Sequence, residues 1–510
     1  MKTGKKLFSL VLAGALFLQV GLPAAQAAGE QSQAQQYAQQ VAYQTEAEGI
    51  VLLKNKNNCL PLEGKQVNVF GAASVKPYYG GGGSGQIDSS DVTDFYTALE
   101  QAGVAYNTEL KSAYTRWSQM HSLNLKEILG AKDFFSFGTK LLFGSVAKVE
   151  MPVNRMTAKV KRNAKKYSDT AIFYYGRSGS EGADLTEENL RLTKEERAVL
   201  DYVTREYRHV IVVFNVANMP EMGWLEEYDT IDAALMIGIP GTVGMQAVAD
   251  VLAGKVNPSG RLTDTIAYQV EDHPSSANFG NYRYPGTLKT YIEYQESIYV
   301  GYRYFETFAP EKVQYPFGYG LSYTDFRWDV HSQVTNCGQR AGKDVVQVYF
   351  SAPYQKGGLE KSAICLAGYA KTELLAPGAS QTVTVQFDFS DMASYGEKEQ
   401  AWVLEAGDYT VSVRRNVRQS VAEEQLPLAE RKVLRYDDKT GAPIQNLFSD
   451  VNGEITYFSR SNPEATYPQG PMTKLTDAVR NADTEPAPKT EGTVPTTGAV
   501  YETGTITLQD

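Results

Sequence analysis

The feature that most constrains this chain is an alternation of apolar runs with amphipathic segments over about residues 45–265. The most apolar runs lie at residues 66–71, 170–175, 209–216 and 233–237. Strands that are apolar along their whole length are typical of parallel sheets buried on both faces. Between two of these runs, Thr193 and Glu196 have the spacing of a helix-capping box. The alternation therefore predicts a parallel-sheet α/β sandwich domain at residues 40–270.

A chain of 510 residues is too long for one ordinary domain, and three further segments follow. Residues 271–325 are rich in Tyr, Gly and Pro without clear periodicity, which predicts a connector. Residues 326–416 alternate with a period of two between turn residues, which predicts a β-sandwich. Its clearest strands are expected at residues 345–350, 381–387 and 409–413. Residues 417–510 are polar and rich in Pro and Thr, so a mostly irregular tail is expected.

The N-terminus has the pattern of a secretory signal. Three lysines precede an apolar run at residues 7–18, and a small-residue cleavage site follows at residues 25–27. The run is too short to span a bilayer comfortably, and no later apolar stretch approaches membrane length. We therefore expect a signal peptide at residues 1–28, a secreted or extracytoplasmic protein, and no membrane span after cleavage.

The charge balance restricts the class of partner. The formal net charge is −10, whereas a nucleic-acid-binding protein needs a basic surface to neutralise phosphates. The densest basic group, at residues 159–166, is too local to change this, and we interpret it as the solvated face of a helix. Nucleic acid is therefore not expected as a partner.

Neither the cysteines nor the histidines have the spacing of a metal site. Cys59, Cys337 and Cys365 are interpreted as small buried residues. Their odd number leaves at least one free thiol, and a Cys337–Cys365 disulfide is an alternative for the other two. The four histidines, which include His209, form no obvious triad and are interpreted as structural. No metal and no cofactor are expected.

In folds of this kind the functional loops lie at the carboxyl ends of the parallel strands. That rule selects the loops at residues 80–85, 176–184 and 215–224. The first is a run of glycines that includes Ser84 and Gly85. It lacks the Lys-Ser/Thr pair of a Walker loop and the acidic partner of a dinucleotide fingerprint. It is either the lining of a site that a ligand approaches closely or a plain flexible loop.

The second loop carries two carboxylates, Glu181 and Asp184, among glycines. A carboxyl group that acts as a general acid needs a raised pKa, which burial against a sugar or an aromatic ring supplies. From the residues alone, a solvated acidic loop is the simpler interpretation. The loop has no G-x-S-x-G elbow, which argues against a serine hydrolase.

Several motifs resemble, in the same order, those of glycoside hydrolase family 3. The parts that resemble its C-terminal α/β sandwich domain are residues 48–55, 60–62, 80–85, 248–254 and 257–262. The sequence Tyr-Pro-Phe-Gly-Tyr-Gly-Leu-Ser-Tyr at residues 315–323, with residues 299–305, resembles the connector of that family. Residues 342–349 and 405–409 resemble the fibronectin type III-like domain of its β-glucosidase branch. The resemblance covers about residues 45–416.

This resemblance implies a β-glucosidase-like hydrolase in which Glu181 is the general acid/base. The corresponding loop of the family usually ends Glu-Gly-x-Asp-Arg, and this chain has Leu185 where the arginine is usual. Such an arginine would pair with the neighbouring carboxylates and orient them. Four further residues are expected to contact a β-linked oligosaccharide or glycoside: Asp184, Arg177, Ser84 and Gly85.

The resemblance also implies a retaining mechanism with a second carboxylate about 5–5.5 Å from the first. In the family this nucleophile is an Asp on a separate (β/α)8 barrel, and no barrel-length segment precedes residue 45 or follows residue 416. The order resembles that of circularly permuted members, in which a segment like residues 455–460 precedes the barrel. We expect the barrel domain to act in trans or to be lost by truncation, so the isolated chain should be weakly active or inactive. The alternative is a non-catalytic module that binds carbohydrate or acts at the cell surface.

Overall fold

The computed structural model describes residues 33–121, 146–179, 185–279, 282–283, 290–329, 333–437, 439–446 and 455–470. The chain divides into two units, residues 1–41 and residues 42–510. The described part of the first unit is the beginning of helix α2 (Gln33–Gly49). The expected signal peptide at residues 1–28 lies outside the described residues.

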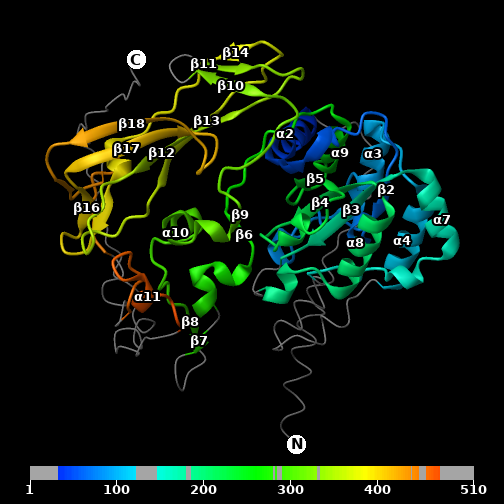
Figure 1. The fold of residues 1–510 in the computed structure, drawn as a ribbon, viewed down its shortest axis with the longest axis horizontal. Helices are drawn as coiled ribbons and strands as arrows, with labels where there is room; N and C mark the ends of the chain where they lie inside the picture. Colours follow the sequence, from blue (N-terminus) through cyan, green and yellow to red (C-terminus); the bar gives the residue numbers. More distant parts are fainter. Residues whose placement is uncertain are drawn as a thin grey trace, which may run out of the picture. The chain divides into compact units, whose positions relative to one another are not determined.

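The α/β domain is built on a five-stranded sheet with the order β1-β5-β4-β3-β2. Figure 1 labels β5, β4, β3 and β2 of this sheet. Its strands are β1 (Val51–Asn55), β2 (Asn68–Phe70), β3 (Thr170–Arg177), β4 (His209–Val216) and β5 (Ile231–Met236). Strands β2 to β5 are parallel, which confirms the predicted parallel sheet. Strand β1 was not predicted and runs antiparallel to β5, so the sheet is mixed.

Alternate residues of the central strands face two separate cores. Ile172 and Tyr174 of β3 lie in the first core, and Phe173 and Tyr175 lie in the second. The first core includes residues of helices α3 (Phe95–Ala102) and α9 (Met245–Ala253), and Ala47 from the end of α2. The second core includes residues of helices α4 (Thr108–Met120), α7 (Ala158–Tyr167) and α8 (Lys194–Glu206). The sheet is therefore buried on both faces, as its continuous apolar strands predict.

The ends of the helices follow local sequence signals. Thr193 and Glu196 form the predicted capping box at the start of α8. Gly254 ends α9 in the left-handed conformation, with φ of 81°, which glycine adopts without steric cost. Helix α7 buries Val160 and Ala164 while most of its basic residues stay exposed. The interpretation of the basic group as a solvated helix face is therefore confirmed.

The connector has short elements rather than a regular layer. They are η8 (Val270–Asp272), η9 (Pro274–Asn278), β7 (Tyr282–Arg283), β8 (Thr290–Tyr291), α10 (Tyr302–Phe308), η10 (Pro310–Lys312) and β9 (Val313–Tyr315). Strand β9 pairs with β6 (Ile266–Ala267), and Leu321 forms a bridge with Leu52 of β1. The connector is thus hydrogen-bonded to the α/β domain at both places.

The β-rich part contains three antiparallel sheets. The first consists of β10 (Phe326–Asp329), β11 (Gln333–Asn336) and β14 (Ser380–Gln381). The second consists of β13 (Cys365–Lys371), β12 (Val345–Ser351), β17 (Gly407–Arg414) and β18 (Ser420–Leu428). The third consists of β15 (Ser394–Gly396), β16 (Ala401–Leu404) and β19 (Lys432–Leu434). The predictions at residues 345–350 and 409–413 match β12 and β17. The strand predicted at residues 381–387 is wrong except at its first residue, because β14 ends at Gln381.

Two strands extend this domain beyond the predicted boundary at residue 416. Strand β18 pairs along β17, and β19 pairs with β16, so the irregular tail does not begin at residue 417. In β18 exposed positions alternate with half-buried ones. Its glutamates make the segment polar overall, so its composition does not distinguish it from an irregular tail. Farther along, Phe458 is buried against Tyr299 and Phe308, so the described end of the tail packs on the connector.

The cysteines differ from one another in their exposure. Cys59 is buried, as predicted, whereas Cys365 is partly buried and Cys337 is exposed. The expectation that all three are buried is therefore wrong for Cys337, and the alternative Cys337–Cys365 disulfide is not formed. Within the described ranges, no helix is long and apolar enough to cross a membrane.

Candidate functional site

The loops at the carboxyl edge of the sheet are joined by backbone hydrogen bonds. The N–H of Gly82, in the glycine run after β2, donates to the carbonyl of Gly179 after β3 at 3.0 Å. Within the glycine run, the N–H of Gly81 donates to the carbonyl of Gly85 at 3.1 Å. The prediction that these two loops meet at one edge is therefore confirmed for their described residues.

The buried side-chain amide of Asn215 links the end of β4 to the segments that follow β2 and β5. Asn215, near the end of β4, is fully buried, and its Oδ1 accepts from the N–H of Tyr78 at 2.7 Å. Its Nδ2 donates to the carbonyls of Tyr78 and of Gly238, which follows β5, at 3.0 and 2.9 Å. Asn215 is the first residue of the loop selected at residues 215–224, and its place as a polar side chain in an apolar strand is the sequence signal for a buried hydrogen-bonding role.

The end of β3 approaches its neighbours so closely that a side chain would not fit. A Cβ added to Gly176 would lie 2.6 Å from the Cβ of Ala73 and 3.2 Å from the ring of Tyr78. The hydroxyl of Tyr78 and the N–H of Ser178 both donate to the carbonyl of Val146, at 2.8 and 2.9 Å. Residues 176–178 are therefore held rigidly by contacts on two sides.

Arg177 is fully buried, and all five of its N–H groups are used within the fold. Two of them form a bidentate pair with Glu196, at 2.7 Å each. The other three donate to the carbonyls of Gly176, Asn189 and Arg191 at 2.7–2.8 Å. Burial lowers the pKa of Arg177, but the charge of Glu196 outweighs that effect and holds the pKa above its usual value.

This placement corrects the expectation that Arg177 contacts substrate. A ligand cannot reach a guanidinium group that is enclosed and whose donors are all bonded to protein. Instead, Arg177 fixes residues 189 and 191 against the end of β3. The segments before and after residues 180–184 are thereby attached to the same strand, so Arg177 is a positioning residue.

Of the other four expected site residues, two lie in the part of the chain that the structure describes. Ser84 and Gly85 lie in η3 (Gly83–Gly85) and are exposed, so a ligand can reach this loop. Glu181 and Asp184 lie outside the described residues. Of the five expected residues, the structure thus describes one that is enclosed and two that are accessible.

A buried carboxyl group lies beneath the loop after β2. Glu150 accepts from the N–H groups of Ala72 and Met151, at 2.7 and 3.0 Å. Burial is the main influence and raises the pKa of Glu150 to about 7, against the opposing effect of the Ala72 hydrogen bond. Because Glu150 is only 6% exposed, it supports the loop and does not contact a ligand.

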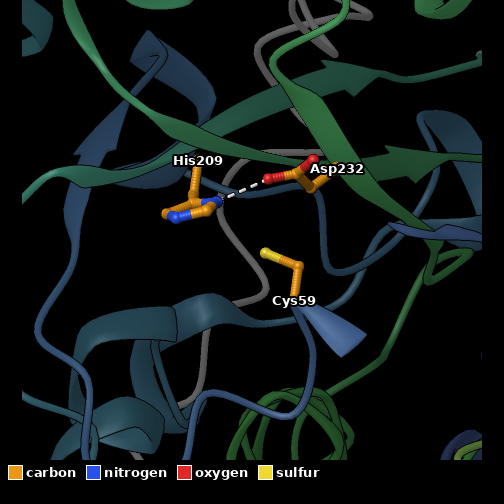
Figure 2. A group of neighbouring side chains, drawn as sticks. All are labelled: Cys59, His209 and Asp232. Atoms are coloured by element: carbon orange, nitrogen blue, oxygen red, sulfur yellow. Dashed lines mark hydrogen bonds and ion pairs between the residues drawn. The ribbon is translucent and has the colours of Figure 1, made fainter. Parts of the chain in front are cut away.

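One set of side chains in the described part of the chain could hold a metal ion, and it lies at the opposite edge of the sheet. Cys59, His209 and Asp232 offer ligand atoms that all lie within 4.8 Å of one another (Figure 2). His209 was interpreted as structural, and no metal site was expected. The three residues are distant in sequence, so no motif spacing indicates that they converge.

Comparison with known proteins gives two domain matches. Residues 50–323 match the Glycosyl hydrolase family 3 C-terminal domain, and residues 344–417 match the Fibronectin type III-like domain. Both matches agree with the resemblance found in the motifs.

Full-length relatives extend well beyond this chain. A beta-glucosidase of Ruminococcus albus is 34% identical over 466 residues, which are 88% of this chain and 46% of the relative. Beta-glucosidase A of Butyrivibrio fibrisolvens is 35% identical over 448 residues, which are 76% of this chain and 51% of the relative. A solved beta-glucosidase structure from Paenibacillus barengoltzii has a TM-score of 0.67 and 36% identity, covering 77% of this chain and 44% of that one. The chain spans about half the length of these proteins.

Proposed function

Because this chain belongs to glycosyl hydrolase family 3, we propose that it takes part in the hydrolysis of β-linked glycosides and supplies the proton donor, Glu181. The relatives named beta-glucosidase support this reaction class. The loop that carries Glu181 follows β3 at the carboxyl edge of the sheet, where functional loops of α/β folds are found.

The observation that carries the proposal is the anchoring of both segments that flank residues 180–184. On one side, Gly179 accepts a hydrogen bond from Gly82. On the other, Asn189 and Arg191 are bonded to the buried guanidinium of Arg177. A general acid must be held close to its productive position, and a loop attached at both ends to a rigid strand meets that requirement.

In this proposal Glu181 protonates the glycosidic oxygen as the bond to the sugar breaks. A retaining reaction then needs a nucleophilic carboxylate about 5–5.5 Å away, which forms a covalent glycosyl intermediate. We propose that this carboxylate comes from the family's barrel domain, so the complete site contains residues of two domains. Glu181 would return as a general base and activate the water that releases the sugar.

The test uses the full chain, alone and mixed with a separately produced barrel domain of the kind that the family's nucleophile requires. Hydrolysis of an alkyl β-glucoside is compared with that of a dinitrophenyl β-glucoside. Glu181→Gln should slow the alkyl substrate by about 10²–10⁴-fold, because its leaving group needs a proton. The comparison is made on kcat/KM, which reports formation of the glycosyl intermediate and not its hydrolysis, the step in which Glu181 acts as base for both substrates. On kcat/KM the dinitrophenyl substrate should be affected much less, because its leaving group departs as a stable anion.

Glu188→Gln is the matched control, because Glu188 is an exposed carboxylate close to the same loop. It should leave both rates unchanged. An equal fall in kcat/KM for both substrates in Glu181→Gln would contradict the proton-donor role. If no mixture hydrolyses either substrate but the chain alone releases heat with cello-oligosaccharides, the chain is a carbohydrate-binding module and the catalytic proposal fails.

We also propose that the chain is exported, on the support of the signal pattern at residues 1–28. N-terminal sequencing of the protein from cells and from culture medium tests this. A mature chain that begins at residue 28 or 29 is expected outside the cytoplasm. An intact Met1 on cytoplasmic protein would contradict export.

A further inference from the structure

We propose that Cys59, His209 and Asp232 form a binding site for a divalent transition-metal ion of the zinc class. The site is separate from the carboxyl-edge loops. His209 is the first residue of β4 and Asp232 is the second of β5, so both lie at the amino ends of parallel strands. An eight-residue strand separates this edge from the other by about 20–25 Å.

Three different segments bring the ligand atoms together. Cys59 follows directly after η1 (Lys56–Asn58), and its N–H donates to the carbonyl of Lys56 at 3.0 Å. Nδ1 of His209 lies 2.6 Å from Oδ2 of Asp232. Because the imidazole and the carboxylate come from paired neighbouring strands, their relative position is set by the sheet.

The set of donor atoms selects the class of ion. A thiolate, an imidazole and a carboxylate are common ligands of zinc, whereas calcium and magnesium prefer oxygen ligands alone. Three protein ligands leave a fourth tetrahedral position for water or another small ligand. The side chain of His209 is 33% exposed, so an ion can reach this position from solvent.

A second possibility for these residues is a nucleophilic triad, and the orientation of the ring argues against it. In a triad the imidazole binds the carboxylate through one nitrogen and the nucleophile through the other. In Figure 2 the sulfur of Cys59 lies on the side of the ring that carries Nδ1, where Asp232 is also bound, and Nε2 points away from both. Convergence on one ring nitrogen suits a shared ion rather than proton transfer along a relay.

Binding requires only a small rearrangement. Bond lengths of about 2.0–2.3 Å place the ligand atoms of a tetrahedral zinc ion about 3.3–3.8 Å apart. The three ligand atoms already lie within 4.8 Å of one another, so the sulfur needs to move inward by no more than about 1–1.5 Å, while Nδ1 and Oδ2 separate from 2.6 Å. Binding through Nδ1 requires that any proton on this nitrogen moves to Nε2 and that the thiol releases its proton.

Two lysines are near the cluster and are held by backbone carbonyls. Nζ of Lys65 donates to the carbonyl of Cys59 at 3.3 Å, and Nζ of Lys54 donates to the carbonyl of Leu225 at 2.8 Å. These bonds direct both ammonium groups to backbone oxygens. The carboxylate of Asp232 and the sulfur of Cys59 remain the groups that an incoming cation meets.

Cobalt(II) titration of the reduced full chain tests the proposal, because cobalt reports its ligands in its absorption spectrum. One cobalt ion per chain is expected, with a near-ultraviolet thiolate-to-cobalt charge-transfer band and visible bands of tetrahedral intensity. Zinc at about a hundredfold above its Kd should displace cobalt and raise Tm by about 5–10 °C.

Cys59→Ala should abolish the charge-transfer band, and His209→Gln should weaken cobalt binding by at least about tenfold. Cys337→Ala is the matched control, because Cys337 is an exposed free thiol, and it should leave the band unchanged. If Cys59→Ala fails to fold, His209→Gln and the zinc-dependent rise in Tm still decide the question. A band that survives in Cys59→Ala or disappears in Cys337→Ala overturns the proposal, as does the absence of binding at millimolar metal.

Discussion

Arg177→Met tests the most specific structural claim about the carboxyl edge, that one enclosed guanidinium holds the segments around residues 180–184. The side chain of Arg177 is fully buried, and that of Glu196 is 7% exposed. Methionine keeps most of the side-chain volume but removes all five donors. The substitution removes the charged partner of a buried carboxylate and takes one donor from each of three carbonyls.

The expected cost follows from the burial of the pair. Removing one member of a buried ion pair costs about 3–5 kcal/mol, whereas an exposed pair contributes about 0–1 kcal/mol. In a domain of about 150–250 residues, 1 kcal/mol corresponds to about 2–4 °C in Tm. Arg177→Met should therefore lower the Tm of the α/β domain by about 6–20 °C.

The measurement is thermal unfolding followed by circular dichroism. Arg197→Met is the matched control, because Arg197 pairs with Glu227 on the surface, where both side chains are more than a third exposed. The double variant Arg177→Met/Glu196→Met removes both members of the pair together. Its loss of unfolding free energy should therefore be smaller than the sum of the losses in the two single variants, by at least about 1 kcal/mol. A change in Arg177→Met no larger than in Arg197→Met, or strict additivity in the double variant, would refute the reasoning.

Two further predictions concern the same edge. Gly176→Ala should cost about 1–3 kcal/mol, because its Cβ would overlap Ala73, whereas Gly179→Ala, with nothing within 4 Å of its added Cβ, should be nearly neutral in urea unfolding. Burial raises the pKa of Glu150 from 4.5 to about 7, so its stabilising effect is fully present below the unfolded-state value and is lost as pH rises through about 7. The unfolding free energy should therefore fall by up to about 3 kcal/mol from pH 4 to pH 8 through this group. Glu150→Gln should remove that part of the pH dependence, and an unchanged pH profile would contradict the assignment.

Much of the α/β domain could be predicted because its signals are local. The apolar runs of β3 and β4 and the capping box at Thr193 depend on a few neighbouring residues, and the structure has all of them where the sequence predicts. The meeting of the glycine run with the loop after β3 also follows from topology, since parallel strands present their carboxyl ends at one edge.

What could not be predicted depends on partners that are distant in the chain. Glu196 was identified by its capping role, yet the same carboxylate also pairs with Arg177, and no local pattern indicates that second bond. Strand β18 was assigned to the tail because its charges dominate its composition. Only the pairing with β17 makes it a strand.

The same distinction between local signals and contacts of distant residues applies to the candidate sites. The sequence located the loop of Glu181 through a motif, but it could not indicate that Arg177 faces inward. The convergence of Cys59, His209 and Asp232 is produced by the register of β4 and β5 together with a turn after β1, which no spacing rule contains.

Strand β1 has a consequence for the order in which the domain can assemble during synthesis. Val51 pairs with Met236, and 236 − 51 = 185 residues must be added before that partner exists. At about 5–20 residues per second, the ribosome needs on the order of 10–40 s for this stretch. During that time the apolar start of β1 has no sheet to join, whereas β2, β3 and β4 become available in their order along the chain. An emerging chain is therefore most open to wrong strand pairing at Val51, Leu52 and Leu53, and a chaperone that holds this segment should raise the yield of folded protein.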